Sequence, residues 1–448
     1  MSRGNRRKRP KHALARPRLP RRFWQLWYAT ALSSTGDGLV GMVALPLLAL
    51  TMTRDPVLIS GVWAANRAAA AVVSLPAGVV TDRWERRSLM VVSELAPGVA
   101  LGGLVAAMVL GVADLAMVYG AAVVISVGEV AYTLAAQAVF PDLVPSPEQL
   151  GVANGRLMAA EAGGEQFVGP SIGGVLFAAA RRLPFVLDAV SFFVSAALVR
   201  VSVPLTKRAL LATESERLTG GSAPAGKAKA GFFRDLSMGF RVFWSKPPLK
   251  LLAAAMALLQ FNQNMVFGLL VLYGRHDLAL SAGGYGLFLA GAAVLGVAGL
   301  YFGGAVHSRL GSSGVVVAGT LACGISFLGM SAAKVAVLGA LAFGVQEFGT
   351  AIANVGSVTT RQQLIPRELF GRVGSVHRLI VVLAGPAGAL LGGLVADATD
   401  VRTALLVAGL VQFSVASLLA PGILRHLPAP ARLAGPVRAS VELHAEEE

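Results

Sequence analysis

The chain has 448 residues, of which 55% are hydrophobic and only 14% are charged, yet its net charge is +15. Soluble domains carry about 25% charged residues, so this composition excludes a single soluble domain. The lone cysteine, Cys323, excludes a disulfide-built secreted protein, and the hydrophobicity excludes disorder for most of the chain. An integral membrane protein or an unusually apolar basic protein remains, and the positions of the charges decide between them.

The first segment is a basic tail, residues 1–22, which holds ten Lys and Arg and no acid. It is not a secretory signal, because the apolar run that follows is too long and no small-residue cleavage site ends it. We therefore expect the first apolar stretch to be a retained membrane helix.

Apolar stretches of about 20 residues or more recur after the tail, and about 20 helical residues cross a bilayer core of roughly 30 Å. The first six expected spans are 24–50, 57–80, 88–111, 114–139, 152–180 and 183–203. The second six are 250–273, 283–304, 313–332, 334–358, 374–397 and 402–423. The predicted fold class is an all-α integral membrane protein with twelve transmembrane helices in two six-helix halves, 23–203 and 250–424.

The basic residues are distributed unequally between the two predicted sides. If the spans alternate from a cytoplasmic N-terminus, 32 of the 39 Lys and Arg fall in cytoplasmic segments and six in outer loops, while Arg67 lies inside a span. Such asymmetry is the positive-inside pattern. We therefore predict a multi-pass protein of the cell membrane with both termini cytoplasmic, including the C-terminal tail 425–448.

The longest polar segment, 204–249, separates the two halves and is predicted to be cytoplasmic. Residues 213–230 have the composition of a flexible linker. Residues 232–246 place aromatic and aliphatic side chains, among them Phe240 and Phe243, at helical spacing. This pattern predicts an amphipathic helix at the membrane surface.

Charged residues inside apolar spans are the candidate functional residues, because an unpaired Asp at the centre of a span costs roughly 2.5–3.5 kcal/mol to insert. Asp37 lies in the first span and Arg67 in the second, and we hypothesise that they pair, with Glu94 as another partner for Arg67. Asp188, in the sixth span, is interpreted as structural.

Three further acids lie in the first half, and we expect Glu129 to be the deepest. Glu161 and Glu165 are four residues apart and share one helix face. They are either proton or substrate groups or residues of a water-exposed inner turn.

Polar residues also interrupt the second half. Glu347 is its only deep acid, with Gln346 beside it. Asn262, Gln263 and Asn264 form a polar cluster in the seventh span. We interpret these side chains as hydrogen-bonding groups that line a central cavity.

Several patterns suggest other functions and are dismissed. Residues 221–228 imitate a phosphate-binding loop, but they lack its Ser or Thr and follow no strand. The basic tail is better explained by anionic lipid than by nucleic acid. The histidines show no metal-ligand spacing and no catalytic set is apparent, so we expect neither an enzyme nor a cofactor.

The two halves contain related segments, which predicts an internal repeat. Residues 141–157, PDLVPSPEQLGVANGRL, are followed by GPSIGGVLF at 169–177. Residues 363–379, QLIPRELFGRVGSVHRL, are followed by GPAGALLGGLV at 385–395. Parallel repeats of six helices are the pattern of one large transporter fold.

The loop after the second span carries the first resemblance to a family. Residues 78–87, GVVTDRWERR, resemble the signature between helices two and three of the major facilitator superfamily, except that Glu85 replaces a glycine. The matching positions are Gly78, Asp82, Arg83, Arg86 and Arg87. The resemblance implies a cytoplasmic gate in which Asp82 latches onto the start of the eleventh helix, where the helix dipole favours a carboxylate.

A second motif looks like the antiporter signature on helix five of that family, which marks exporters. Its matching residues are Gly169, Pro170, Gly173 and Gly174. Residues 34–50, 181–198 and 235–250 are similar to the branch that includes macrolide and siderophore exporters.

The resemblance implies export of an amphipathic small molecule by alternating access, driven by the proton gradient, from a protein expected to be monomeric in the lipid bilayer. Asp37, Glu129 and Glu347 are the candidate proton carriers. Uptake, lysophospholipid flipping and a non-transporting membrane sensor or scaffold are the alternatives.

Overall fold

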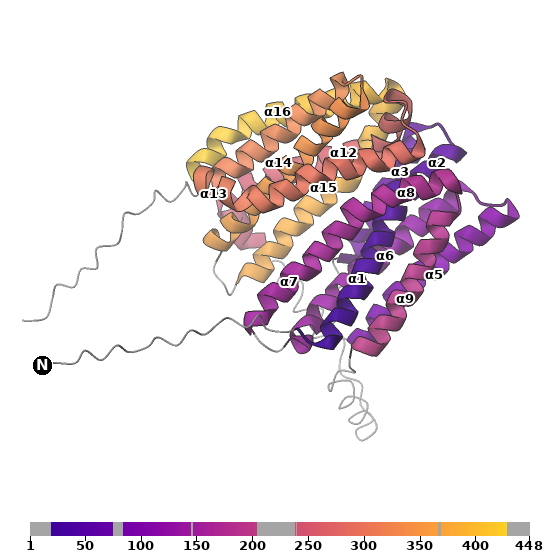
Figure 1. The fold of residues 1–448 in the computed structure, drawn as a ribbon. Coiled ribbons are helices and arrows are strands. Elements are labelled where there is room, and N and C mark those ends of the chain that lie inside the picture. Colours follow the sequence, from indigo (N-terminus) through magenta and orange to yellow (C-terminus); the bar gives the residue numbers. More distant parts are fainter. Residues whose placement is uncertain are drawn as a thin grey trace, which may run out of the picture.

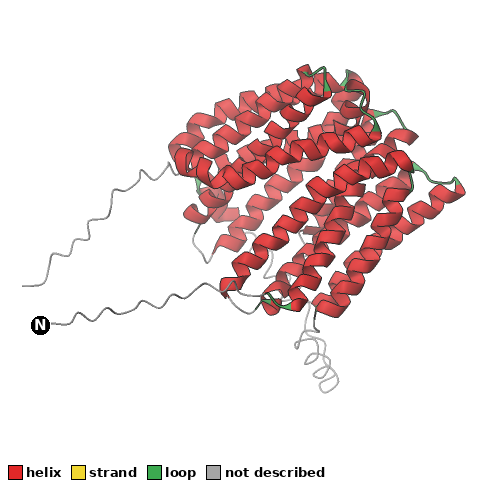
Figure 2. Cartoon of the chain, in the orientation of Figure 1, coloured by secondary structure: helices red, strands yellow, loops and turns green. Residues whose placement is uncertain are grey.

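The computed structural model describes residues 19–74, 84–144, 147–203, 238, 240–365 and 369–427. These residues form helices joined by short loops, and no strand occurs among them (Figure 2). The all-α fold class is therefore confirmed for this part of the chain.

The helices before the central linker correspond to the first six expected spans. The first and fifth spans are each interrupted by a π-helical segment, η1 or η2, and the others are single α-helices. The elements are α1 (Arg21–Leu39), η1 (Val40–Ala44), α2 (Leu45–Met52), α3 (Pro56–Ser74), α5 (Arg86–Leu110), α6 (Leu115–Leu143), α7 (Pro147–Ala162), η2 (Gly163–Val168), α8 (Gly169–Ala179) and α9 (Leu183–Ser202).

The helices after the linker correspond to the second six expected spans. The elements are α12 (Pro247–Leu272), η3 (Tyr273–Asp277), α13 (Ala282–Ala332), α14 (Ala336–Leu364), α15 (Phe370–Ala398) and α16 (Val401–His426). The 51-residue α13 contains both expected spans 283–304 and 313–332. Gly311 divides it, with a φ of 70° that glycine tolerates without steric cost.

Ten of the described helices are long and apolar enough to cross a membrane. This group counts α13 once and omits α7–η2–α8, whose acids lower its hydropathy. The chain is therefore a multi-pass membrane protein by length and hydropathy.

Polar side chains cap the helices at one end of the bundle. The carboxylate of Asp55 accepts hydrogen bonds from the first turn of α3, Asp114 does so for α6 and Asp400 for α16. Ser281 caps α13, and Gly111 ends α5 in the left-handed conformation. These residues fix where the helices turn back. We call this the loop end, and the opposite end, where α1 begins and α16 ends, the tail end.

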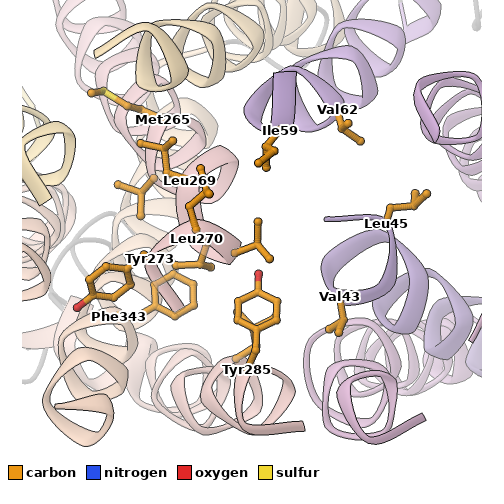
Figure 3. Packing of buried hydrophobic residues seen from close by; sticks show 14 of the residues in the cluster. Val43, Leu45, Ile59, Val62, Met265, Leu269, Leu270, Tyr273, Tyr285 and Phe343 are labelled. Carbon is orange, nitrogen blue, oxygen red and sulfur yellow. The ribbon is translucent and has the colours of Figure 1, made fainter. Parts of the chain in front are cut away.

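The helices of residues 21–202 and those of residues 247–426 form two groups that lie side by side (Figure 1). Contacts between the groups include those of α3 with α12 and α15, and of α8 with α13. Tyr285 is buried at this boundary and its hydroxyl donates to the carbonyl of Met42 at 3.4 Å. Figure 3 shows Tyr285 between Leu270 of α12 and Val43 of η1. The buried core is thus continuous across the two halves.

Some predicted features lie outside the described residues. They include Gly78, Asp82 and Arg83 of the loop motif, residues 1–18 and 428–448 of the two tails, and the linker 204–237. The amphipathic segment is described for residues 238 and 240–246, in which 240–245 are helical. There Phe243 is buried against Leu249, while Trp244 is exposed and stacks on Phe240.

Candidate functional site

The first half encloses a cavity of about 220 Å³ that is lined by acids, and we call it the acidic cavity. Thr30, Ser33 and Tyr132 add hydroxyl groups, and the described lining contains no Lys or Arg. The five acids come from α1, α5, α6, α7 and η2: they are Asp37, Glu94, Glu129, Glu161 and Glu165. The chain therefore gathers acids that are far apart in sequence around one internal space.

Glycines bring α1 and η2 close enough to place these acids together. A Cβ atom on Gly38 would overlap the backbone of Glu165, and one on Gly164 would lie 2.9 Å from the backbone nitrogen of Thr35. Asp37 immediately precedes Gly38, so backbone contact between the two helices sets Asp37 beside Glu165. Small residues permit this approach in membrane helices.

The acids of this cavity differ in burial and in hydrogen bonding. Glu94 is only 2% exposed and accepts a hydrogen bond from Ser33 at 3.3 Å. Asp37 has a buried carboxylate oxygen without a partner. Glu129, at the middle of α6, is exposed, whereas Glu161 and Glu165 are half-buried, so the position of an acid along its helix does not set its burial. Hydropathy locates a residue along a helix but not the direction in which its side chain points.

A second cavity, of about 180 Å³, lies between the two halves, and we call it the central cavity. Aromatic, amide and charged side chains share its lining. The lining residues are Met42, Trp63, Arg67, Glu165, Gln166, Gln260, Gln263, Asn264, Phe267, Leu289, Ala293, Phe343 and Glu347. Such a mixture suits a molecule with both apolar and polar parts.

An aromatic wall crosses this cavity from one half to the other. The rings of Trp63 and Phe267 stack at 5.4 Å, and Phe343 meets Phe267 edge-on at 5.5 Å. Trp63 also donates a hydrogen bond to Asn264 at 2.9 Å, and the guanidinium of Arg67 lies 4.4 Å from the centre of the Trp63 ring. The wall thus links α3 to α12 through ring stacking and a hydrogen bond, and the cation–π contact within α3 places Arg67 against Trp63.

Glu165 belongs to both cavities. Arg67, on the central-cavity side, attracts the carboxylate of Glu165, whereas Glu129 and Glu161, on the acidic-cavity side, repel it. Within the described residues no ion pair joins Asp37 to Arg67, and these two side chains line different cavities. The hypothesised Asp37–Arg67 pair is therefore absent from this conformation, and the carboxylate that Arg67 faces is Glu165.

The polar residues of the second half divide into cavity-lining and packing residues. Glu347 lines the central cavity and has a buried carboxylate oxygen without a partner. Asn264 and Gln263 also line it, but Asn262 does not: Asn262 is buried and donates to Gln412 of α16 at 3.0 Å. Gln346 is buried and does not line the cavity, and its amide nitrogen donates to Thr350 at 3.1 Å.

Asp188 lies outside both cavities, in the packing of α9 against α1. Its carboxylate accepts a hydrogen bond from Ser191 at 2.9 Å. A Cβ atom on Gly36 would overlap that carboxylate. This position fits the structural interpretation.

The glycines of the helix-five motif are packing residues. Cβ atoms on Gly169 or Gly173 would press on the backbone of α1, 2.5 Å from the oxygen of Thr35 and 2.9 Å from that of Leu39. A Cβ on Gly174 would overlap the carbonyl oxygen of Ala282 in the second half. Pro170 lies in the first turn of α8, directly after η2. The motif thus joins α8 to α1 on one side and to α13 on the other.

The described part of the loop motif begins α5. Glu85, which replaces the expected glycine, accepts hydrogen bonds from the backbone nitrogens of Arg87 and Ser88 and so caps the helix. Arg86 donates to the carbonyl of Ala138 at 2.9 Å. The departure from the family pattern therefore has a local role as a helix cap.

The sequence prediction missed the aromatic wall. Trp63, Phe267 and Phe343 carry no sequence signal of function, because aromatic residues in membrane helices also face lipid and the hydrophobic core. Gln166 and Gln260 were missed for a related reason, since nothing in a lone glutamine distinguishes a cavity residue. The sequence feature that could have indicated Gln260 is Asn264, which lies one helical turn away and lines the same cavity.

A model of the Major Facilitator Superfamily matches residues 26–385 of the chain. The chain belongs to the major facilitator superfamily. No curated protein matches it.

Solved structures of major facilitator transporters share the fold. A bacterial homologue of the human lysosomal transporter Spinster, in an inward-facing and unoccupied conformation, has a TM-score of 0.68 and 15% identity over 92% of this chain and 98% of its own. The nucleoside transporter NupG has a TM-score of 0.68 and 13% identity over 91% and 99%. A bacterial homologue of the iron transporter ferroportin, also inward-facing, has a TM-score of 0.68 and 18% identity over 91% and 99%. The chain is thus a membrane transporter by family, with a small-molecule substrate and a non-enzymatic role.

Proposed function

We propose that the protein is a secondary active transporter that exports an amphipathic small molecule in exchange for protons, by alternating access of its two halves. The observation that carries the proposal is the position of Glu165. Its carboxylate borders both the acidic cavity and the central cavity. A proton that reaches Glu165 from one side therefore competes with a ligand that reaches it from the other.

The acidic cavity supplies the proton side of this exchange. Asp37, Glu129 and Glu161 line it together with Glu165, and no Lys or Arg is among the described residues of its lining. Several like charges in one enclosed space cannot all remain ionised at low cost, so some of these groups hold protons. Substrate that binds beside Glu165 and Arg67 changes the charge balance of the set and releases or recruits a proton.

The central cavity supplies the substrate side. Trp63, Phe267 and Phe343 form an apolar wall, while Asn264 and Glu347 provide polar partners. An amphipathic molecule satisfies both kinds of group. The buried, unpartnered oxygen of Glu347 adds a second carboxylate as a proton or ligand site in the other half.

The proposed transporter has twelve membrane-spanning segments. The two parts of α13 on either side of Gly311 each span the membrane once, and α7–η2–α8 spans it once despite its acids. Acids on a crossing helix are tolerated where they face a cavity, and Glu161 and Glu165 do so. The loop motif with Asp82, Arg83, Arg86 and Arg87 then acts as the gate at the cytoplasmic end.

The direction of transport rests on the helix-five motif, whose counterpart marks exporters. Uptake on the same cavities, including of a nucleoside, and lysophospholipid flipping remain competing functions. A non-transporting sensor is disfavoured because it has no need for a central cavity of about 180 Å³.

Purified protein in sealed vesicles with an imposed pH gradient tests the proposal. We would screen hydrophobic antibiotics and siderophores and expect a substrate to move against the proton flow. Movement that persists unchanged after an uncoupler collapses the gradient would exclude proton antiport. No movement of any compound would favour the sensor.

A further inference from the structure

A third cavity, of about 300 Å³, lies at the loop end between the two halves, and we call it the basic pocket. Arg54 and Arg181 line it from the first half, and Arg275 and His276 from the second. None of the described residues that line it is acidic. The sequence assigns six Lys and Arg to the outer loops, and three of them meet here.

Helix ends from both halves position these side chains. Arg54 follows α2, Arg181 follows α8, and Arg275 and His276 belong to η3. The close contact of α8 with α13 brings Arg181 toward the second half, because Ala282 lines the same pocket. The four side chains therefore converge only while the halves are packed together at this end.

The nearby acids are already engaged elsewhere. Asp55 caps α3 through the backbone nitrogens of Val57 and Leu58. Asp277 pairs with Arg402 at 2.9 Å. Neither of these acids lines the pocket, and each has a hydrogen-bond or ion-pair partner outside it.

The basic side chains of the pocket have spare donor capacity. Among the residues that the structure describes, neither Arg54 nor Arg181 has a hydrogen-bond or ion-pair partner, although Arg275 donates to the carbonyl of Leu280. Like charges held together repel each other, and an anion between them removes the repulsion. Arginine suits this role because its planar donors match the oxygens of phosphate.

We propose that the basic pocket binds a phosphate-class oxyanion, which bridges the halves and favours the conformation closed at the loop end. The oxyanion is either a free phosphate or the phosphodiester of a lipid headgroup. The site is separate from the acidic and central cavities and does not depend on proton coupling.

The binding test uses the full-length protein in a neutral detergent without added lipid. We would measure the melting temperature with inorganic phosphate, with dioctanoyl phosphatidylglycerol, and with chloride at matched ionic strength. A saturable rise with phosphate supports a free-anion site, and a rise with the lipid alone supports a headgroup site. The proposal is overturned if neither raises the melting temperature above the chloride control.

Charge-removal variants localise the binding. Arg54→Gln and Arg181→Gln should each weaken the affinity by about tenfold or more, since a hydrogen bond to a charged group is lost. Lys334→Gln is the matched control, because Lys334 is exposed at the same end but does not line the pocket. Equal weakening in Lys334→Gln would show nonspecific screening and contradict the proposal.

The bridging role has its own readout. Spin labels on Val112→Cys and Val335→Cys report the separation of the halves, because both sites are exposed at the loop end, one on each half, and the natural Cys323 is buried. Saturating ligand should shift the distance distribution toward the shorter separation, and Arg181→Gln should abolish the shift. If saturating ligand leaves the distance distribution unchanged in the labelled protein that retains Arg181, the bridging role is refuted even if the ligand binds.

Discussion

Two asparagines on α12 lie two positions apart, and one packs between helices while the other lines a cavity. Asn262 is 1% exposed and connects α12 to Gln412, whereas Asn264 lines the central cavity and accepts a hydrogen bond from Trp63. Both were predicted to line the cavity. Residues two apart on a helix point about 200° apart, so both could not face the same space.

The two asparagines should respond differently to substitution. Asn262→Leu leaves the amide oxygen of Gln412 without its partner in a buried site, and we expect a loss of about 1–3 kcal/mol of stability. Asn264→Leu should lower the stability less and reduce transport more, because Asn264 and its partner Trp63 both line the central cavity. Melting temperature in detergent and transport in vesicles separate the effects; equal losses of stability would contradict the assignment.

A substitution of Glu165 tests its proposed role in proton exchange. Glu165→Gln keeps the size of the side chain but removes its proton exchange, so gradient-driven transport should fall at least about tenfold while the protein folds normally. Glu161→Gln is the control one turn earlier, since Glu161 lines only the acidic cavity. We would measure initial rates with and without a pH gradient. A larger defect in Glu161→Gln than in Glu165→Gln would contradict the role given to Glu165.

The close contact between α8 and α13 packs the two halves against each other at the loop end. Gly174 touches the backbone of Ala282, and a Cβ atom on Gly286 would overlap the carbonyl of Pro170. Neither half can approach the other this closely with a larger residue at these positions. The helix-five motif therefore acts through packing between the halves.

Gly174→Ala should separate the halves at the loop end. The added methyl group overlaps Ala282, so we expect a longer distance between spin labels at Val112→Cys and Val335→Cys. Gly291→Ala is the control on α13, because a Cβ atom there meets nothing within 4 Å. An unchanged distance in Gly174→Ala, or an equal change in both variants, would contradict this account.

The helices and the acids of the cavities could be predicted from sequence, because hydropathy marks a span and an acid within a span is conspicuous. Asp37 and Glu165 were found in this way. The cavity that each acid faces could not be predicted, since it depends on the rotation of α1 and η2 about their axes. The basic pocket was also missed, because Arg54 and Arg181 meet Arg275 only through packing between the halves.

At the scale of the whole molecule, the two ends of the bundle differ in charge. Most Lys and Arg of the sequence lie in the tails and in the segments that join helices at the tail end. The positive-inside pattern predicts that this end lies in the cytoplasm. With this predicted orientation, the basic pocket would face the outside of the cell, and the proposed gate motif after the second span would face the inside.

The orientation can be tested in intact cells. Single cysteines at Ser2→Cys and Val112→Cys should react differently with a membrane-impermeant maleimide. We expect labelling at Val112 and protection at Ser2 until the cells are permeabilised. Since the natural Cys323 is buried, unsubstituted protein provides the blank. Labelling of Ser2→Cys in intact cells would reverse the predicted topology.

The π-helical segments η1 and η2 would allow part of each helix to rotate about its axis while the backbone stays hydrogen-bonded. Each π turn holds more residues than an α turn, and one residue corresponds to about 100° of rotation. Converting η1 or η2 to regular α geometry would therefore twist the rest of its helix by about that angle while the backbone hydrogen bonds re-form one residue along. Asp37 lies just before η1, and Glu165 lies within η2. A helical twist of this kind would turn a carboxylate from one cavity toward the other without exposing the main chain to lipid.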